Sequence, residues 1–262
     1  MNKKQKYYQY VRQLSDLQIS LENIYIKKLR ALRRELYNQY ASQYLRYRFV
    51  NSSNLNVIFA HRKLFIDMTK KIMKPSDMIV KRQIKLLIKE SDDVYDEYVN
   101  EYIESSYTAA KIVSISNTFL DGVREVIESG ISQGLAPSEI ASDLRKLVSL
   151  KDFEIVRIAR TETASAMNYA QFSRAKSLQE QYEIQMYKKW NPVFDKRTRP
   201  DHYAMGSHPA IKMDARFNVG GELMDHPHSS EGSSKNVINC RCSMMTLTAE
   251  SAKILGITIS DQ

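Results

Sequence analysis

Apolar residues in the first half of the chain recur every three to four positions. This spacing is seen in two sets of residues, Leu14, Leu17, Leu21 and Ile24, and Tyr95, Tyr98 and Tyr102. It places apolar side chains on one face of an α-helix. Glycine and proline, which interrupt helices, are nearly absent here, because the first glycine is Gly122 and only Pro75 precedes it among the prolines. The pattern therefore predicts long helices up to about residue 120.

Within this region we expect one helix over about residues 6–48. A break is expected at Asn51–Asn56, and a further helix is expected to start at Pro75-Ser76-Asp77, with the proline in its first turn. The pattern leaves open whether the region is a single arm or a folded-back bundle.

After Gly122 the pattern changes. Residues 121–150 predict a helical hairpin, with Gly134 as a helix stop and Pro137 as the restart. A helix is expected over about residues 152–182. From residue 186 onward, short β-like pieces alternate with loops rich in Gly, Pro, His and Ser. The sequence thus predicts an α+β fold, with a mainly α-helical N-terminal arm or bundle (1–120) followed by a compact α+β domain with a small sheet (121–262).

Composition excludes several classes of protein. The chain has 262 residues, is 43% hydrophobic and 26% charged, and has only two cysteines. No run approaches the roughly 18 apolar residues of a membrane span, and the first residues lack the apolar core of a secretion signal. A membrane protein, a collagen and a disulfide-stapled secreted miniprotein are therefore not expected.

Charge is divided unevenly along the chain. Residues 1–89 carry 20 basic and 5 acidic residues, a net of +15, and residues 90–104 carry seven acidic residues and no basic one. Residues 121–262 hold 18 of each sign. The asymmetry favours a polyanionic partner for the N-terminal half, and the alternative is a well-solvated helical surface.

Tyrosine and arginine alternate in the first helix. Eight of the sixteen tyrosines lie in residues 7–47, and Tyr37, Tyr40, Tyr44 and Tyr47 follow the helical step. Aromatic residues between basic ones can stack on nucleic-acid bases, but a tyrosine stripe is also typical of a packing face. The expected nucleic-acid contacts are Arg30, Arg33, Arg34, Arg46 and Arg48.

Histidines and cysteines gather near the C-terminus. Four of the five histidines lie within 27 residues, and Cys240 and Cys242 follow them. Both residue types are preferred zinc ligands. We expect one structural zinc held by His202, Cys240 and Cys242, with His226 or His228 as the fourth ligand. The alternative is that the thiols are small buried apolar groups and the histidines bond to loop carbonyls. A Cys240–Cys242 disulfide is not expected, because one intervening residue strains its geometry.

A second polar set lies around the only tryptophan, Trp190. It comprises Arg160, Glu162, Asp195, Arg197 and Arg199. Because buried charges must pair, we interpret the set as structural, with Arg197 or Arg199 tying its loop to Glu162 or Asp195. The enzymatic alternative is metal-dependent hydrolysis through Glu162, Asp195 and His202. Nucleophilic catalysis by a cysteine beside His202 is weaker, since no orienting group or oxyanion donor is evident.

Four stretches occur in order along residues 121–246: RTETASAMNYAQ, KKWNPVFDKRTRPDH, FNVGGE and INCRC. Together they resemble the phage Mu F-like minor head proteins, also called phage head morphogenesis proteins of tailed bacteriophages. The residues of this pattern are Arg160, Thr161, Glu162, Thr163, Trp190, Asp195, Arg197, Thr198, Arg199, His202, Phe217, Gly221, Asn239, Cys240, Arg241 and Cys242.

This resemblance implies a non-enzymatic virion protein, which lies inside the phage head and passes through the host cytoplasm during assembly. The implied partners are the portal protein and a capsid or scaffolding protein, and the implied role is in head morphogenesis and DNA packaging or delivery. The basic arm fits sequence-independent contact with phage double-stranded DNA. Two alternatives stay open: a metal-dependent hydrolase or toxin-like effector built on this domain, and a basic DNA-binding protein acting outside any particle.

Overall fold

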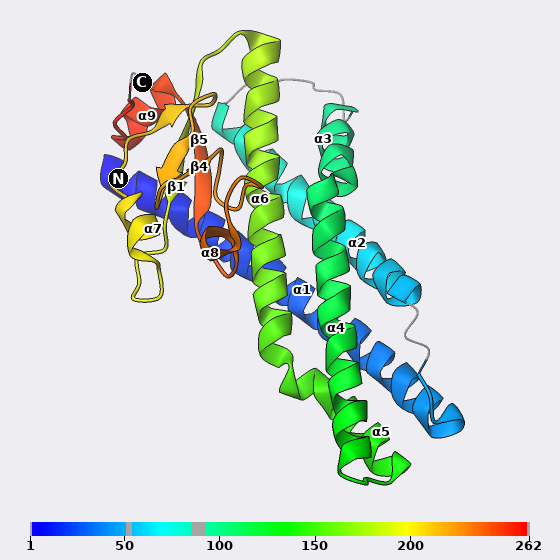
Figure 1. Cartoon of the computed structure of the whole chain (residues 1–262). Coiled ribbons are helices and arrows are strands. Elements are labelled where there is room, and N and C mark those ends of the chain that lie inside the picture. The colour runs from blue at the N-terminus through cyan, green and yellow to red at the C-terminus, as the bar shows by residue number, and fades with distance from the viewer. Residues whose placement is uncertain (1, 51–53, 85–92, 261–262) are drawn as a thin grey trace. The chain divides into compact units, whose positions relative to one another are not determined.

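A computed structural model describes residues 2–50, 54–84 and 93–260 of the chain. About 70% of the chain is helical. The helices in the described part are α1 (Lys3–Tyr47), α2 (Asn54–Ile84), α3 (Asp93–Glu104), α4 (Ser106–Ser132), α5 (Pro137–Leu150), α6 (Asp152–Tyr182), α7 (Pro200–Ala204), α8 (Ser234–Val237) and α9 (Ala249–Leu255). The strands are β1 (Met186–Asn191), β2 (Ile211–Lys212), β3 (Phe217–Val219), β4 (Glu222–Met224) and β5 (Ser243–Thr248) (Figure 1). The predicted α+β class is confirmed.

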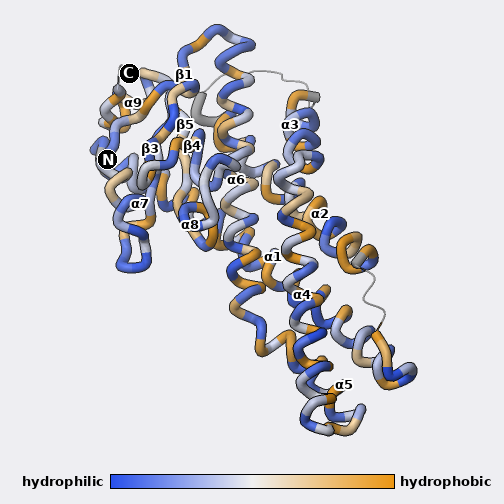
Figure 2. Tube along the Cα trace, in the orientation of Figure 1, coloured by the Kyte–Doolittle hydropathy of each residue, from blue (hydrophilic) through white to orange (hydrophobic). Residues whose placement is uncertain are grey.

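The first helix is continuous over 45 residues, in agreement with the expected 6–48. It contains no glycine or proline, and its buried positions repeat at helical spacing. Hydrophobic and hydrophilic positions alternate along the helices in Figure 2, as expected for elements that bury one face. Among the described residues, no helix is both long enough and apolar enough to cross a membrane.

The prediction that a helix starts at Pro75 is wrong, because Pro75 lies inside α2. Proline removes one backbone donor and usually kinks a helix. Here the next residue, Ser76, donates its hydroxyl to the Ile72 carbonyl at 3.0 Å. Ile72 and Met73 are also fully buried, so packing supports this part of the helix. Of the expected break at Asn51–Asn56, residues 51–53 lie outside the described residues, and α2 begins at Asn54.

The expected hairpin is present as α4 and α5. Gly134 adopts φ +68° between them, a conformation that favours glycine. Pro137 occupies the first turn of α5, and the Ala136 amide donates to the Glu139 carboxylate at 2.7 Å. Because Gly134 and Pro137 act locally, the sequence alone predicted this hairpin correctly.

Two small antiparallel sheets follow α6. One has the strand order β2-β1-β5, with Lys188 of β1 opposite Thr246 of β5 and Ile211 of β2. The other pairs β3 with β4. Gly220 and Gly221, both with positive φ, form the turn between β3 and β4. The Gly221 amide donates to the side chain of Asn218 at 3.1 Å.

By contacts, the chain divides into two compact units. Unit 1 comprises residues 1–22, 69–103 and 160–262, and unit 2 comprises residues 23–68 and 104–159. Residues on both sides of the expected boundary at residue 120 enter each unit. Unit 1 contains both sheets and an apolar cluster around Trp190. Unit 2 is helical and is centred on Phe119.

In unit 2 the tyrosine stripe of α1 forms a packing face. Tyr37, Tyr40 and Tyr44 are buried, while Tyr47 is exposed. The ring of Tyr37 stacks on Phe119 at 4.5 Å between centroids, and burial raises the pKa of Tyr37 to about 12. Three of the four tyrosines therefore stabilise the core of unit 2 and are not available for stacking on bases.

Buried His61 of unit 2 gives a pH-dependent stability. Burial and the nearby charge of Arg33 lower the pKa of His61 to about 4. His61 is therefore protonated below about pH 6.5 in the unfolded chain but only below about pH 4 in the folded chain. The free energy of unfolding is unaffected by His61 above pH 6.5 and decreases as the pH falls from 6.5 to about 4. We expect a loss of roughly 2–3 kcal/mol over this window. The His61→Gln variant should lose less than the parent in urea titrations at pH 7 and pH 4.5, and equal losses would contradict this assignment.

Candidate functional site

Three of the expected metal ligands lie together in unit 1. His202 comes from α7, and Cys240 and Cys242 come from the segment just before β5. The His202 Nδ1 atom lies 3.4 Å from the Sγ atom of each cysteine. All three side chains are buried. In the described part of the chain, this is the only group of three or more His, Cys, Asp or Glu ligand atoms within 4.8 Å of one another.

Asn236 fixes the orientation of the His202 ring. Its Oδ1 atom lies 3.2 Å from His202 Nε2, and its Nδ2 atom donates to the Val219 carbonyl at 3.2 Å. Because the Asn236 oxygen only accepts, His202 carries its hydrogen on Nε2. The lone pair of Nδ1 therefore faces the two thiols. Trp190 packs edge-on against His202, with ring centroids 5.5 Å apart.

Two polar contacts set the direction of the cysteines. Asn168 of α6 donates to the Cys242 carbonyl at 3.2 Å and accepts from the Met244 amide at 2.7 Å. Between the cysteines, Arg241 forms a fork to Asp195, with contacts of 2.7 and 2.6 Å. Arg241 is directed toward Asp195, whereas the cysteines on either side of it are buried. Both thiols lie next to His202.

The three groups influence each other's protonation. A hydrogen bond from Cys242, opposed by burial, lowers the pKa of the Cys240 thiol, and His228 and His202 lower it further. The hydrogen bond to Cys240 and burial raise the pKa of Cys242. Burial alone would lower the pKa of His202, but its hydrogen bond and charge interaction with Cys240 outweigh burial and raise it. The arrangement thus favours a thiolate on Cys240.

The remaining histidines separate into two kinds. Nδ1 of His208 lies 2.9 Å from the Pro209 carbonyl, and Nδ1 of His226 lies 2.9 Å from the Pro227 carbonyl. These two fit the alternative in which histidines bond to loop carbonyls. Burial also lowers the pKa of His226 to about 4. His228 is different: it is 1% exposed, and neither ring nitrogen has a hydrogen-bond partner in the described part of the chain.

The second polar set braces the C-terminal segment against α6. Arg160 donates to Glu22 at 3.1 Å and to the Asn239 side chain at 2.7 Å. The Asn239 amide donates to the Thr161 hydroxyl at 2.9 Å. Asn239 has φ +59°, so these contacts hold the turn that leads into Cys240. Glu162 is buried as well.

Asp195 is held mainly by Arg241, a residue that sequence reasoning did not assign. Arg197 lies 3.6 Å from Asp195 and is exposed, and Arg199 instead donates to the Ile238 carbonyl at 2.7 Å. The Arg241 hydrogen bonds hold the pKa of the Asp195 carboxyl well below its usual range. The one feature of the sequence that could have indicated a structural role for Arg241 is its position between Cys240 and Cys242.

The enzymatic grouping of Glu162, Asp195 and His202 is not assembled. Within the described residues these three do not form a cluster of ligand atoms. Asp195 instead pairs with Arg241, and His202 bonds to Asn236 and the thiols.

The five arginines expected at nucleic acid have different environments. Arg30 forms a fork to Asp152 with contacts of 2.6 and 2.7 Å. Arg33 is fully buried and lies 3.3 Å from Glu154, so it is not available to a phosphate. Arg34, Arg46 and Arg48 are exposed. Burial therefore excludes Arg33 from phosphate contact, Arg30 is already paired with Asp152, and Arg34, Arg46 and Arg48 are the exposed members of the set.

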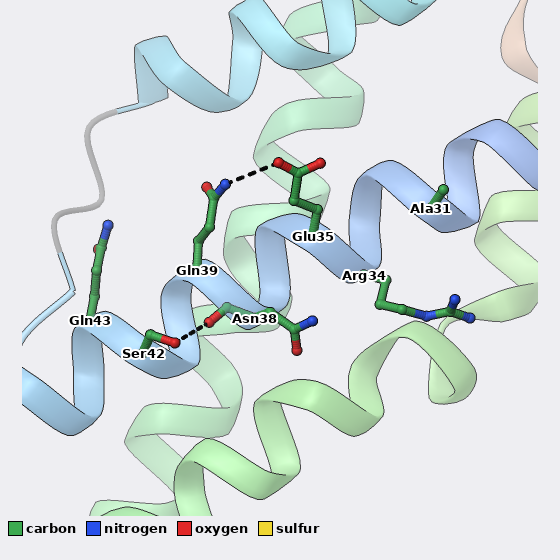
Figure 3. Close-up of a pocket in the computed structure, with 7 residues that line it drawn as sticks. All are labelled: Ala31, Arg34, Glu35, Asn38, Gln39, Ser42 and Gln43. Carbon is green, nitrogen blue, oxygen red and sulfur yellow. Dashed lines mark hydrogen bonds between the residues drawn. The ribbon is translucent and has the colours of Figure 1, made fainter.

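Arg34 borders a shallow polar depression on α1 (Figure 3). In this depression Gln39 donates to Glu35 at 3.4 Å and Ser42 donates to the Asn38 carbonyl at 2.8 Å. The lining residues are Ala31, Arg34, Glu35, Asn38, Gln39, Ser42 and Gln43. No histidine or cysteine is among these lining residues, and the Ser42 hydroxyl is bonded to its own helix.

These observations define the class of the C-terminal part: an α+β region in which motif residues brace loops around a buried His–Cys cluster. Residues 121–245 match the family model of Phage Mu protein F like proteins. The expected resemblance is thus confirmed for this segment, and residues 121–245 carry a phage Mu F-like domain. Comparison of the chain with curated proteins and with solved structures finds no match.

Proposed function

We propose that the chain is a structural minor component of a tailed-phage head that associates with the portal and the interior of the procapsid. The match of residues 121–245 to the phage Mu F family carries the proposal. The roles of its motif residues support it, since Arg160 and Thr161 each bond to Asn239 and Arg241 holds Asp195. These contacts brace the fold around the motif.

The proposal is tested by co-expressing the chain with the portal, capsid and scaffolding proteins of its phage. Purified procapsids should retain the chain when portal is present and lose it when portal is omitted. Mature particles should contain the chain at a low, fixed ratio to the capsid protein by mass spectrometry. Absence of the chain from both particles would refute the proposal.

We further propose that exposed arginines in and directly after α1 contact packaged DNA without sequence specificity. The exposed Arg34, Arg46 and Arg48 support this, together with the net charge of +15 over residues 1–89. Each phosphate that a side chain neutralises adds about 0.9 to the slope of log affinity against log salt. Changing all three to glutamine should therefore lower this slope by about 2 to 3 in duplex-DNA titrations.

A matched variant removes the same charge at three other positions, one of which, Arg12, also lies on α1. Arg12, Arg124 and Lys146 are exposed and each pairs with a nearby aspartate. Changing these three to glutamine should leave the salt slope nearly unchanged. Equal effects of the two triple variants would mean that only net charge matters, and absence of binding at low salt would remove DNA from the proposal.

A further inference from the structure

The spacing of the His202, Cys240 and Cys242 ligand atoms fits a tetrahedral metal ion. With Zn–S bonds of about 2.3 Å and Zn–N bonds of about 2.0–2.1 Å, tetrahedral angles place a nitrogen and a sulfur ligand roughly 3.5 Å apart. His202 Nδ1 lies 3.4 Å from both sulfurs. A histidine nitrogen that already faces two thiols at this separation needs little rearrangement to bind an ion.

The hydrogen bonds around the cluster also suit a metal. Histidine ligands commonly donate their other ring N–H to a fixed acceptor, which orients the ring. Asn236 Oδ1 is such an acceptor, and Asn236 is itself held by the Val219 carbonyl. The Cys242 carbonyl is held by Asn168. The ligands are thus oriented by residues from α6, α8 and β3.

His228 supplies what the three-residue group lacks. It is almost fully buried with both ring nitrogens unpartnered in the described chain, which is costly for a polar group without a ligand. Its ring nitrogens lie outside the group that His202, Cys240 and Cys242 form within 4.8 Å of one another, so the His228 side chain would have to move toward the other three to bind the same ion. Its backbone has φ +68°, a left-handed conformation that is uncommon for residues other than glycine.

We propose that His202, His228, Cys240 and Cys242 bind one Zn²⁺ as a structural site. Two thiolates and two imidazoles in a tetrahedron are the donor set typical of zinc. Four protein ligands leave no open position for substrate, so the ion would link α7, the 226–233 loop and the start of β5 without catalysing a reaction. The proposal is independent of the proposed role in the phage head.

Trp190 makes the site measurable in the unaltered protein. It is the only tryptophan, it is buried, and its ring lies 5.5 Å from that of His202. The full chain is purified under reducing conditions, stripped with a chelator and titrated with Co²⁺. We expect quenching of Trp190 fluorescence and a thiolate-to-cobalt charge-transfer band, both saturating at about one equivalent and both reversed by Zn²⁺. Zn²⁺ should also raise the Tm of the stripped protein.

The variants test the individual ligands. His228→Asn suits the positive φ, because asparagine tolerates this conformation, and Cys240→Ser removes one thiolate. Each should weaken Co²⁺ affinity by more than the roughly 10–100-fold expected for losing only an outer hydrogen-bond partner, as in Asn236→Ala. The matched control is His226→Asn, a buried histidine two positions away that should bind Co²⁺ like the parent.

Each result has a defined meaning. Absence of saturable Co²⁺ or Zn²⁺ binding by the reduced parent chain would overturn the site. If His228→Asn bound cobalt as tightly as the parent and with the same spectrum, His228 would not be a ligand and the four-residue assignment would be wrong. If a variant failed to fold, titration of the parent alone would still decide whether a two-thiolate site exists.

Discussion

Replacing Arg174 with methionine should destabilise unit 1 by about 3–5 kcal/mol, because it removes the buried cation that pairs with the buried carboxylate of Asp77. Arg174 on α6 and Asp77 on α2 are both fully buried and form a hydrogen-bonded ion pair. Tyr98 on α3 donates to the same Asp77 oxygen at 2.6 Å, and Lys81 lies 3.3 Å from the other oxygen. Urea unfolding monitored by Trp190 fluorescence reports on this unit.

The control for this prediction is Arg12→Met. The Arg12–Asp16 pair of α1 is largely exposed, with its atoms 3.9 Å apart, so its loss should change stability by no more than about 0.5 kcal/mol. The double variant Asp77→Leu with Arg174→Met should recover much of the loss, since it removes both buried charges. An Arg174→Met variant as stable as Arg12→Met would show that Asp77 finds other compensation.

The elements that sequence predicted well depend on local signals. The continuous α1, the α4–α5 hairpin and α6 follow from helical spacing, from Gly134 and from Pro137. Pro75 was misassigned because its effect depends on tertiary surroundings: the same residue that starts one helix is tolerated inside another when packing supports it. The Asp77–Arg174 pair was also beyond reach, since its members lie 97 positions apart.

The candidate site divides in the same way. His202, Cys240 and Cys242 could be selected because histidine and cysteine are scarce in this chain and have specific metal chemistry. Asn168, Asn236 and Arg241 could not, because asparagine and arginine serve many roles and only the fold shows which atoms they bond. The structure also distinguishes His228 from His226, whose chemistry in sequence is identical.

Charge counting had a comparable limit. The count shows that the N-terminal half carries a net positive charge. It does not distinguish basic side chains that face solvent from those that form ion pairs within the fold. Arg30 and Arg33 bind Asp152 and Glu154 within unit 2. The tyrosines between them behave likewise, since most of the stripe lies in the core. Many charged and aromatic side chains of a basic helix can therefore stabilise its own fold and be unavailable to a partner.

Replacing Phe119 with alanine should destabilise unit 2 by about 3–5 kcal/mol, the range for truncating a buried aromatic side chain. Phe119 on α4 is 1% exposed and stacks on Tyr37. Its ring also lies 6.0 Å from that of Tyr40 and 5.9 Å from that of His61. Truncation therefore opens a cavity bounded by α1 and α2. Urea unfolding followed by far-UV circular dichroism measures the loss, because unit 2 is helical.

Phe153→Ala is the matched control for this prediction. Phe153 belongs to the same unit but is 61% exposed, so its truncation should cost no more than about 0.5 kcal/mol. Trp190 lies in the other unit, so its fluorescence transition separates loss of unit 2 from unfolding of the whole chain. If Phe119→Ala cost as little as Phe153→Ala, the tyrosine face of α1 would not be held by this core.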